Sequence, residues 1–204
     1  MTAASTLAWH TASVTLIACC WGLCGIVWLA GAVYNARHAP VVRRRVSRAW
    51  GWLLVVAAVW FAGAAVPDSV WRALTVHAPW LRALGAAVLL AGTAFTLWAR
   101  AVLGTMWSAA VVSRQEHVLR TGGPYQITRH PIYTGLLAML TGSALLDGLG
   151  RSLLAIALGV AIALVKLHLE ERLMTEVFPG EYEEYRRRVP QLVPGLHWPP
   201  RPPR

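Results

Sequence analysis

The sequence predicts an all-α integral membrane bundle of about five transmembrane helices. Three observations support this fold class: 56% of the 204 residues are hydrophobic, only 14% are charged, and five apolar stretches are long enough to cross a bilayer. These stretches cover residues 14–34, 50–66, 81–103, 131–146 and 153–169. Hydrocarbon offers no partners for backbone N–H and C=O groups, so each stretch is expected to be a helix.

Local patterns predict how these helices are arranged. Residues 147–150 join the last two stretches through a short turn containing two glycines, which predicts an antiparallel helical hairpin. Small residues at a spacing of four predict close helix packing, and they are Ala83, Ala87 and Ala91, and Gly159 and Ala163. Mixed charges at 181–188, ended by Pro190, predict a short surface helix whose Tyr182 and Tyr185 point back toward the membrane or a site.

The positive charges predict the orientation of the bundle. Of the 19 lysines and arginines, sixteen lie at or after the end of the first, third or fifth stretch, which places them on one side of the membrane. The other three, Arg72, Arg82 and Arg151, fall on the opposite side. Cytoplasmic segments collect such residues, so the N-terminus is expected outside and the C-terminus in the cytoplasm. The net charge of +10 then reflects topology, and no nucleic-acid partner is expected. In a bacterium the host membrane would be the inner, plasma membrane.

The three cysteines are predicted to be packing residues. Cys19, Cys20 and Cys24 lie within one apolar run that has no His or Asp companion, so neither a disulfide framework nor a zinc site is expected. No metal site is predicted elsewhere. No Lys or Arg precedes this run, which argues against a secretory signal peptide and favours a retained membrane anchor.

Polar residues divide the single predicted membrane domain, 1–204, into parts. Residues 1–103 hold three apolar helices, residues 104–194 hold most of the polar clusters, and 195–204 form a proline-rich tail. Glycines at 122 and 123 allow the backbone to approach a ligand. Pro131 at a helix start would leave Arg129, His130 and free helix amides facing the membrane surface, where they suit an anionic group.

A second polar cluster ends the fifth apolar stretch. Lys166 and Glu170 are four residues apart and share a helix face, and His168 and Glu171 are three apart. Charged groups at a helix end also occur as simple markers of the membrane interface. Two carboxylates, a histidine and a lysine beside another polar segment nevertheless favour a site, whose carboxylates would hold a cation.

These clusters resemble the cofactor-binding signature of the isoprenylcysteine carboxyl methyltransferases and the related phospholipid methyltransferases. The first part of the resemblance is His117, Val118, Leu119, Arg120, Gly123, Pro124, Tyr125, Arg129, His130, Pro131, Ile132, Tyr133, Thr134 and Gly135. The second part is Glu170, Glu171, Glu181, Tyr182, Tyr185, Arg187, Arg188, Val189 and Pro190. Together they extend over nearly half of the chain.

The resemblance implies S-adenosylmethionine as the cofactor. The residues that it implies as contacts are His117, Val118, Leu119, Arg120, Gly123, Tyr125, His130, Pro131, Ile132, Tyr133 and a glutamate at the end of the last membrane helix. In the family an arginine four residues before that glutamate is thought to face the methyl acceptor. Alignment without a gap places this pair on Leu164 and His168, whereas a slip of two residues places it on Lys166 and Glu170.

We favour the slip, because a cationic cofactor is stabilised by a carboxylate rather than by leucine and histidine. His168, Glu170 and Glu171 are all candidates for the cofactor contact, and Arg129, Lys166 and Glu170 are the predicted catalytic residues. A carboxylate acceptor would need only a basic partner, Lys166 or Arg129, whereas an amine would need His168 or a glutamate to accept its proton.

The predicted function is therefore methyl transfer from S-adenosylmethionine to a lipophilic carboxylate, amine or thiol, in a site facing the cytoplasm. Membrane lipids are the other expected partners. Two alternatives stay open. Sterol reductases carry a related Arg-His and Tyr-Gly pattern, which would indicate an NADPH-dependent, steroid-reductase-like enzyme. A non-catalytic membrane scaffold would use the same polar residues only to set topology.

Overall fold

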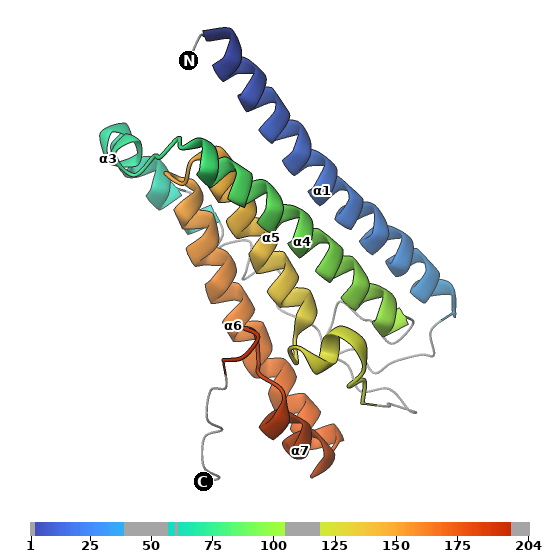
Figure 1. Cartoon of the computed structure of the whole chain (residues 1–204). Helices are drawn as coiled ribbons and strands as arrows, with labels where there is room; N and C mark the ends of the chain where they lie inside the picture. Colours follow the sequence, from blue (N-terminus) through green and yellow to red (C-terminus); the bar gives the residue numbers. More distant parts are fainter. Residues whose placement is uncertain (1–2, 39–56, 60, 105–118, 197–204) are drawn as a thin grey trace.

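A computed structural model describes residues 3–38, 57–59, 61–104 and 119–196. The described chain is helical throughout its named elements (Figure 1). In chain order they are α1 (Ala3–His38), α3 (Asp68–Ala73), α4 (Pro79–Leu103), the 3-10 helix η2 (Gly123–Gln126), α5 (Pro131–Asp147), α6 (Ser152–Val177) and α7 (Glu181–Arg188).

Helix length and composition identify an all-α, multi-pass membrane protein. Within the described residues, three helical segments are long and apolar enough to span a bilayer: Ala8–Asn35, Pro79–Leu103 and Ser152–Val177. Helix α5 has 17 residues, at the short end of the range for a span. The predicted stretches 14–34, 81–103, 131–146 and 153–169 each fall within a helix. Of the stretch 50–66, residues 57–59 and 61–65 are helical, whereas 50–56 and 60 lie outside the described residues.

The tightest packing joins α4 to α5 through glycines. A Cβ atom added at Gly142 would lie 2.5 Å from the backbone N of Leu89 and 2.7 Å from the carbonyl O of Gly85. One added at Gly92 would lie 2.9 Å from the carbonyl O of Gly135. The two backbones are therefore in direct contact, as small residues permit in membrane helices.

The predicted alanine stripe on α4 is wrong as a packing surface. Ala83, Ala87 and Ala91 are exposed, because the face of α4 turned toward α5 carries Gly85 and Gly92 instead. The stripe on α6 does pack. Ala163 is buried, and a Cβ at Gly159 would lie 2.5 Å from a methyl carbon of Leu140 on α5.

Helices α5 and α6 form the predicted hairpin, and its turn is fixed by the segment between α3 and α4. Gly148 and Gly150 have φ angles of +92° and +49°, in the left-handed region that favours glycine, and Leu149 between them has φ +67°. The backbone N of Val76 donates to Gly148 O at 2.8 Å, and Gly150 N donates to Leu74 O at 3.3 Å.

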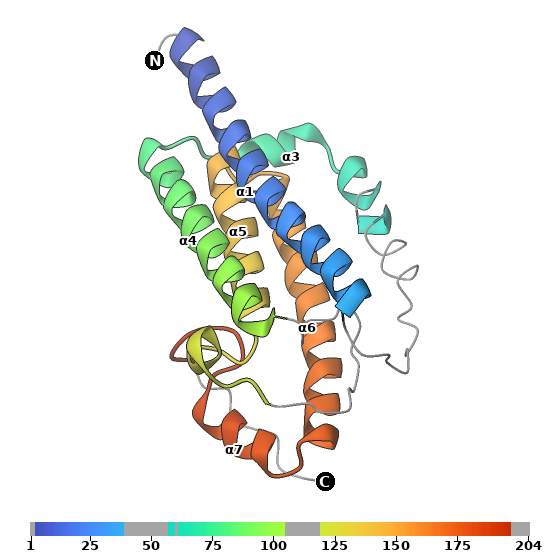
Figure 2. The ribbon, with the colours of Figure 1, turned by 90° about the vertical axis from the view of Figure 1, so that its right-hand side faces the viewer.

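Polar segments gather at the opposite end of the bundle, away from the N-terminus (Figure 2). Here η2, the start of α5, the end of α6 and α7 come together. The surface helix predicted at 181–188 is α7, and its Tyr182 and Tyr185 are buried in a cluster with Phe178 and Val189. Acidic residues occupy the first turn of α7 and basic residues its last, an arrangement that the helix dipole stabilises.

Candidate active site

Arg129 lies at the centre of the polar end, between α5, α6 and α7. Its Nε and Nη2 donate to Oε1 of Glu171 at 3.0 and 2.7 Å, and its Nη1 donates to the carbonyls of Arg186 and Val189 at 2.9 and 2.8 Å. The side chains of the ion pair are only 8% and 15% exposed. All three guanidinium nitrogens are engaged, so Arg129 holds the segment after α6 against the start of α5.

The backbone at the start of α5 is also occupied by this C-terminal segment. The amides of Arg129 and His130 donate to the carbonyls of Pro190 and Gln191 at 2.8 and 3.2 Å. The hydroxyl of Thr134 donates to Leu192 O at 2.7 Å. The C-terminal segment therefore occupies the backbone just before α5, whereas the helix amides predicted to suit an anionic group belong to the first turn of α5 itself.

Glu170 is the more open of the two carboxylates. Its Oε1 accepts a hydrogen bond of 2.6 Å from the hydroxyl of Tyr133, and its Oε2 lies 3.6 Å from Nδ1 of His130. Its side chain is 29% exposed, about twice the exposure of Glu171. Tyr133 and His130 thus orient a carboxylate that keeps access to its surroundings.

His130 lies between both glutamates. Its Nε2 is 3.3 Å from Glu171 Oε1, and the whole residue is only 8% exposed. Burial lowers the pKa of His130, but the hydrogen bonds and negative charges of Glu170 and Glu171 outweigh burial and raise this pKa above its usual value. The protonated imidazole is therefore favoured as a counter-charge to the two carboxylates.

The 3-10 helix η2 closes the same region from the α4 side. The backbone O of buried Tyr125 accepts a 2.6 Å hydrogen bond from the hydroxyl of Tyr185 on α7. Burial, followed by the charge of neighbouring groups that include Glu170, raises the pKa of Tyr125. Gly123 has φ +61° and packs against Trp98 and Val102 of α4, so a left-handed residue is needed at this turn.

Tyr182, predicted to point toward the membrane or a site, was not among the predicted cofactor contacts. Its side chain is 2% exposed, and its hydroxyl has no hydrogen-bond partner within the described residues. Burial, and next the nearby charge of Glu171, raises the pKa of Tyr182. An unsatisfied buried hydroxyl close to the Arg129–Glu171 pair is costly unless a ligand completes it. Its spacing of three from Tyr185 was the sequence signal.

The remaining predicted residues differ in how close they lie to this cluster. Leu119 packs against the Tyr182 and Tyr185 cluster, Pro131 is buried and Ile132 is half-buried. Arg120 is exposed. On α6, Lys166 is half-buried and His168 is exposed, whereas Ala163 and Leu167 are buried. Glu170 contacts Tyr133 of α5 and is partly exposed. His117 and Val118 lie outside the described residues.

Comparison with known proteins assigns the part of the chain that holds this site to a protein family. Residues 80–181 match the family model described as phospholipid methyltransferase, which is half of the chain. The chain belongs to the phospholipid methyltransferase family. The matched residues include α4, η2, α5 and α6, and therefore Arg129, His130, Tyr133, Glu170 and Glu171.

Curated family relatives have several different names. The chain is 31% identical over 148 residues to methanethiol S-methyltransferase 2 of Bradyrhizobium diazoefficiens, covering 72% of this chain and 54% of the relative. It is 30% identical over 123 residues to protein-S-isoprenylcysteine O-methyltransferase B of Arabidopsis thaliana, covering 58% and 61%. It is 36% identical over 99 residues to the cobalt-zinc-cadmium resistance protein CzcN of Cupriavidus metallidurans, covering 47% and 45%. The matches thus span about half the length of these relatives.

A solved structure supports the fold assignment. The eukaryotic intramembrane Ras methyltransferase ICMT, an isoprenylcysteine carboxyl methyltransferase, matches with a TM-score of 0.53 over 75% of this chain and 55% of that chain. The two sequences are 20% identical in this match, so the likeness concerns the helical arrangement.

Proposed function

We propose that this chain is an S-adenosylmethionine-dependent membrane methyltransferase acting on a lipophilic acceptor. The observation that carries the proposal is the partly exposed carboxylate of Glu170, which Tyr133 and His130 orient where α5 and α6 meet. A fixed carboxylate stabilises a cation at short range, and family membership supports methyl transfer as the reaction.

The residues around Glu170 fit this cofactor. Glu170 offers negative charge for a sulfonium, and the unsatisfied hydroxyl of Tyr182 offers a hydrogen bond to a polar group. S-adenosylmethionine, when bound, supplies an electrophilic methyl group. The protein then has to align the acceptor, exclude water and hold its own charges in place.

Other residues have distinct proposed roles. Arg129 is a positioning residue, because its three nitrogens bind Glu171 and two backbone carbonyls and hold the C-terminal segment. Lys166 remains our proposed basic partner for a carboxylate acceptor, and Glu170 our proposed proton acceptor for an amine or thiol. We propose that Glu170, rather than His168, contacts the cationic part of the cofactor, since His168 is exposed.

We also propose five transmembrane helices with the N-terminus outside and the site facing the cytoplasm. The end of α4, η2, the start of α5, α7 and the C-terminal segment all lie at one end of the bundle (Figure 2). Sixteen of the 19 basic residues belong to segments that this topology places on the cytoplasmic side. A water-soluble cofactor would reach the site from there.

Isothermal titration calorimetry on the purified chain in detergent micelles tests the cofactor assignment. We expect S-adenosylmethionine to bind, and Glu170→Gln to weaken its affinity roughly tenfold or more through loss of the charge. Glu176→Gln, on the exposed side of α6, is the matched control and should bind as the natural chain does. Tyr182→Phe should weaken binding less than Glu170→Gln.

Three outcomes would contradict the proposal. NADPH binding more tightly than S-adenosylmethionine would indicate the reductase-like enzyme. Binding of neither cofactor would indicate a scaffold. Equal affinities for the Glu170→Gln and Glu176→Gln variants would remove Glu170 from the site.

The class of methyl acceptor needs its own experiment. The relatives are named for methanethiol and for isoprenylcysteine, so a small thiol and a lipidated carboxylate are the first two candidates. Purified chain with radiolabelled methyl donor would be given methanethiol, a farnesylcysteine analogue or a lipid amine. Lys166→Ala should impair methylation of the carboxylate more than that of the thiol, because only the carboxylate needs a basic partner.

A further inference from the structure

His130 contacts both carboxylates of the candidate site with a single imidazole ring. Its Nε2 lies 3.3 Å from Oε1 of Glu171, and its Nδ1 lies 3.6 Å from Oε2 of Glu170. Arg129 supplies a second positive charge, with Nη2 at 2.7 Å from Glu171. An arginine keeps its charge at any pH that a folded protein meets, whereas a histidine can lose its charge near neutrality. With His130 protonated, the two cations balance the two carboxylates.

Protonated His130 occupies the carboxylate that is proposed to hold the methyl donor. Glu170 Oε1 accepts a hydrogen bond of 2.6 Å from the hydroxyl of Tyr133, which is a neutral donor, and Glu170 Oε2 faces His130. Among the described residues, His130 is the one cation within ion-pair distance of Glu170. A sulfonium bound at Glu170 would share its counter-charge with the imidazole, and two cations at one carboxylate repel each other.

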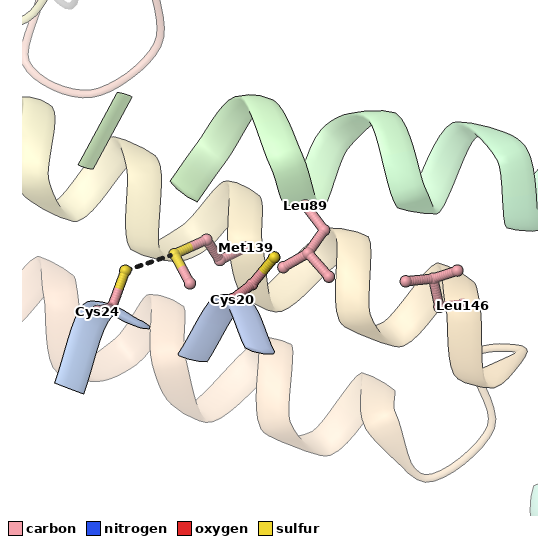
Figure 3. Packing of buried hydrophobic residues seen from close by; sticks show 5 residues of the cluster. All are labelled: Cys20, Cys24, Leu89, Met139 and Leu146. Carbon is pink, nitrogen blue, oxygen red and sulfur yellow. Dashed lines mark hydrogen bonds between the residues drawn. The ribbon is translucent and has the colours of Figure 1, made fainter. Parts of the chain in front are cut away.

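The imidazole has little room to move away from a second cation. His130 is 8% exposed and immediately precedes α5, which is fixed on two sides. On the α4 side the backbones touch at Gly135, and on the α1 side the thiol of Cys24 contacts the thioether of Met139, with Sγ 3.7 Å from Sδ (Figure 3). The amide of His130 also donates to the carbonyl of Gln191. Loss of a proton therefore relieves the repulsion more easily than displacement of the ring.

We propose that His130 carries a proton while the site is empty and releases it to solvent when S-adenosylmethionine binds at Glu170, an inference that rests on the proposed function. The charge of the site then stays balanced, because one cation replaces another at the same carboxylate. After methyl transfer the electron pair of the broken S–CH3 bond stays on sulfur, and the thioether that remains is neutral. His130 then takes a proton back from solvent and restores the balance.

Ionisable groups surround the cluster of His130 and the two glutamates on every packed element. They are Arg129 and Tyr133 beside it, Glu170 and Glu171 on α6, Tyr125 on η2 and Tyr182 on α7. Burial raises the pKa of Tyr125 and of Tyr182, so both stay neutral near pH 7. Burial lowers the pKa of His130, but Glu170 and Glu171 raise it above its usual value. His130 is therefore the group of this set that exchanges a proton near neutrality.

The direction of the pH dependence follows from this competition. Protonated His130 opposes the sulfonium, so the affinity for S-adenosylmethionine should rise with pH through the pKa that His130 has in the empty site. Exchange of one proton changes the affinity by at most about tenfold per pH unit. S-adenosylhomocysteine has the same amino and carboxyl groups but no sulfonium charge, so its affinity should depend less on pH.

The test is isothermal titration calorimetry of the purified full chain in micelles, repeated in buffers of different ionisation enthalpy from about pH 6.5 to about pH 8.5. The dependence of the heat on the buffer gives the number of protons released. We expect S-adenosylmethionine to release more protons than S-adenosylhomocysteine, by up to about one per chain. The shared amino group contributes equally to both ligands, so the difference between them isolates the sulfonium.

Two histidine variants assign the proton. His130→Gln should remove the difference between the two ligands. His77→Gln is the matched control and should keep it, because His77 is exposed beside the hairpin turn at the other end of the bundle. NMR of the natural chain with isotope-labelled histidines reports the same event without a variant at the site. The His130 ring should change from its charged to its neutral form with S-adenosylmethionine but not with S-adenosylhomocysteine.

The possible failures are distinguishable. Equal proton release by the two ligands, a difference that persists in His130→Gln, or a difference that disappears in His77→Gln would each overturn the role of His130. In these cases the methyl donor still binds, and the proposed function stands. An imidazole of His130 that keeps its charge on binding would overturn the inference in the same way. Binding of neither ligand would overturn both proposals.

Discussion

Helix α5 has two contrasting contacts along its length. Its body lies against α4 with backbone touching backbone, through Gly135 and Gly142, and it uses no charge. Its first turn is instead surrounded by charges and by carbonyls of the C-terminal segment. The comparison shows how one helix is both fixed in the bundle and equipped with a polar site. Close packing sets where α5 lies, and the ionic contacts set what its end can bind.

The largest expected effect concerns the polar contact. Glu171→Gln leaves the buried guanidinium of Arg129 without its counter-charge, and the free energy of unfolding should fall by about 3–5 kcal/mol. Unfolding by denaturant in micelles measures this change. The Glu184→Gln variant removes an exposed partner of Arg188 and should change little. If both variants were equally stable, the ionic contact would not hold the C-terminal segment.

The apolar contact should respond to added volume rather than to charge. In Gly142→Ala the new methyl group would meet the backbone of Leu89 and Gly85, so the unfolding free energy should drop by about 1–3 kcal/mol. Gly25→Ala on α1 has nothing within 4 Å and serves as the control. Helix propensity should stabilise that variant by up to about 1 kcal/mol. A Gly142→Ala variant as stable as Gly25→Ala would refute direct backbone contact.

The polar contact alone should depend on pH near neutrality. Because the folded pKa of His130 is raised, its stabilising contribution is fully present below about pH 6.5 and is lost as pH rises through the folded pKa. One proton changes stability by at most about 1.4 kcal/mol per pH unit. Thermal unfolding of the natural chain and of His130→Gln, measured from pH 6 upward, tests this. The difference between the two should shrink as pH rises.

The smallest expected effect separates two neighbouring tyrosines. Tyr185→Phe removes the hydrogen bond to the Tyr125 carbonyl and should cost about 1 kcal/mol. Tyr182→Phe removes a hydroxyl without a partner in the described residues, so stability should be unchanged or slightly higher. Chemical unfolding of both variants measures the pair. A larger loss for Tyr182→Phe would mean that its hydroxyl is satisfied in the folded protein.

Much of the fold was predictable because the length of each apolar stretch and the residues of each turn can be read directly from the sequence. Helix α5, the hairpin turn and the short helix α7 follow the predicted ranges closely, whereas α6 continues eight residues beyond the predicted end at Leu169. The α4–α5 contact was missed because its glycines recur at a spacing of seven, whereas alanines at a spacing of four occupied another face.

The candidate site was predictable only in its side chains. His130, Tyr133, Glu170 and Glu171 come together because the start of α5 lies against α6 about two turns before α6 ends, and their polarity indicated this meeting. The carbonyls of Arg186, Val189, Pro190 and Gln191 that bind Arg129 and His130 were not predictable, since every residue has a carbonyl. His168 is exposed because the helical period turns Leu167, Glu170 and Glu171 toward α5 instead.

The glycine contact between α4 and α5 also limits how a hydrophobic molecule can travel. Where a single methyl group would collide with backbone, no acyl or prenyl chain can slide through. The contact between α4 and α5 therefore leaves no passage at Gly85, Gly92, Gly135 and Gly142. A lipid-borne compound heading for Glu170 from within the bilayer therefore cannot pass between α4 and α5.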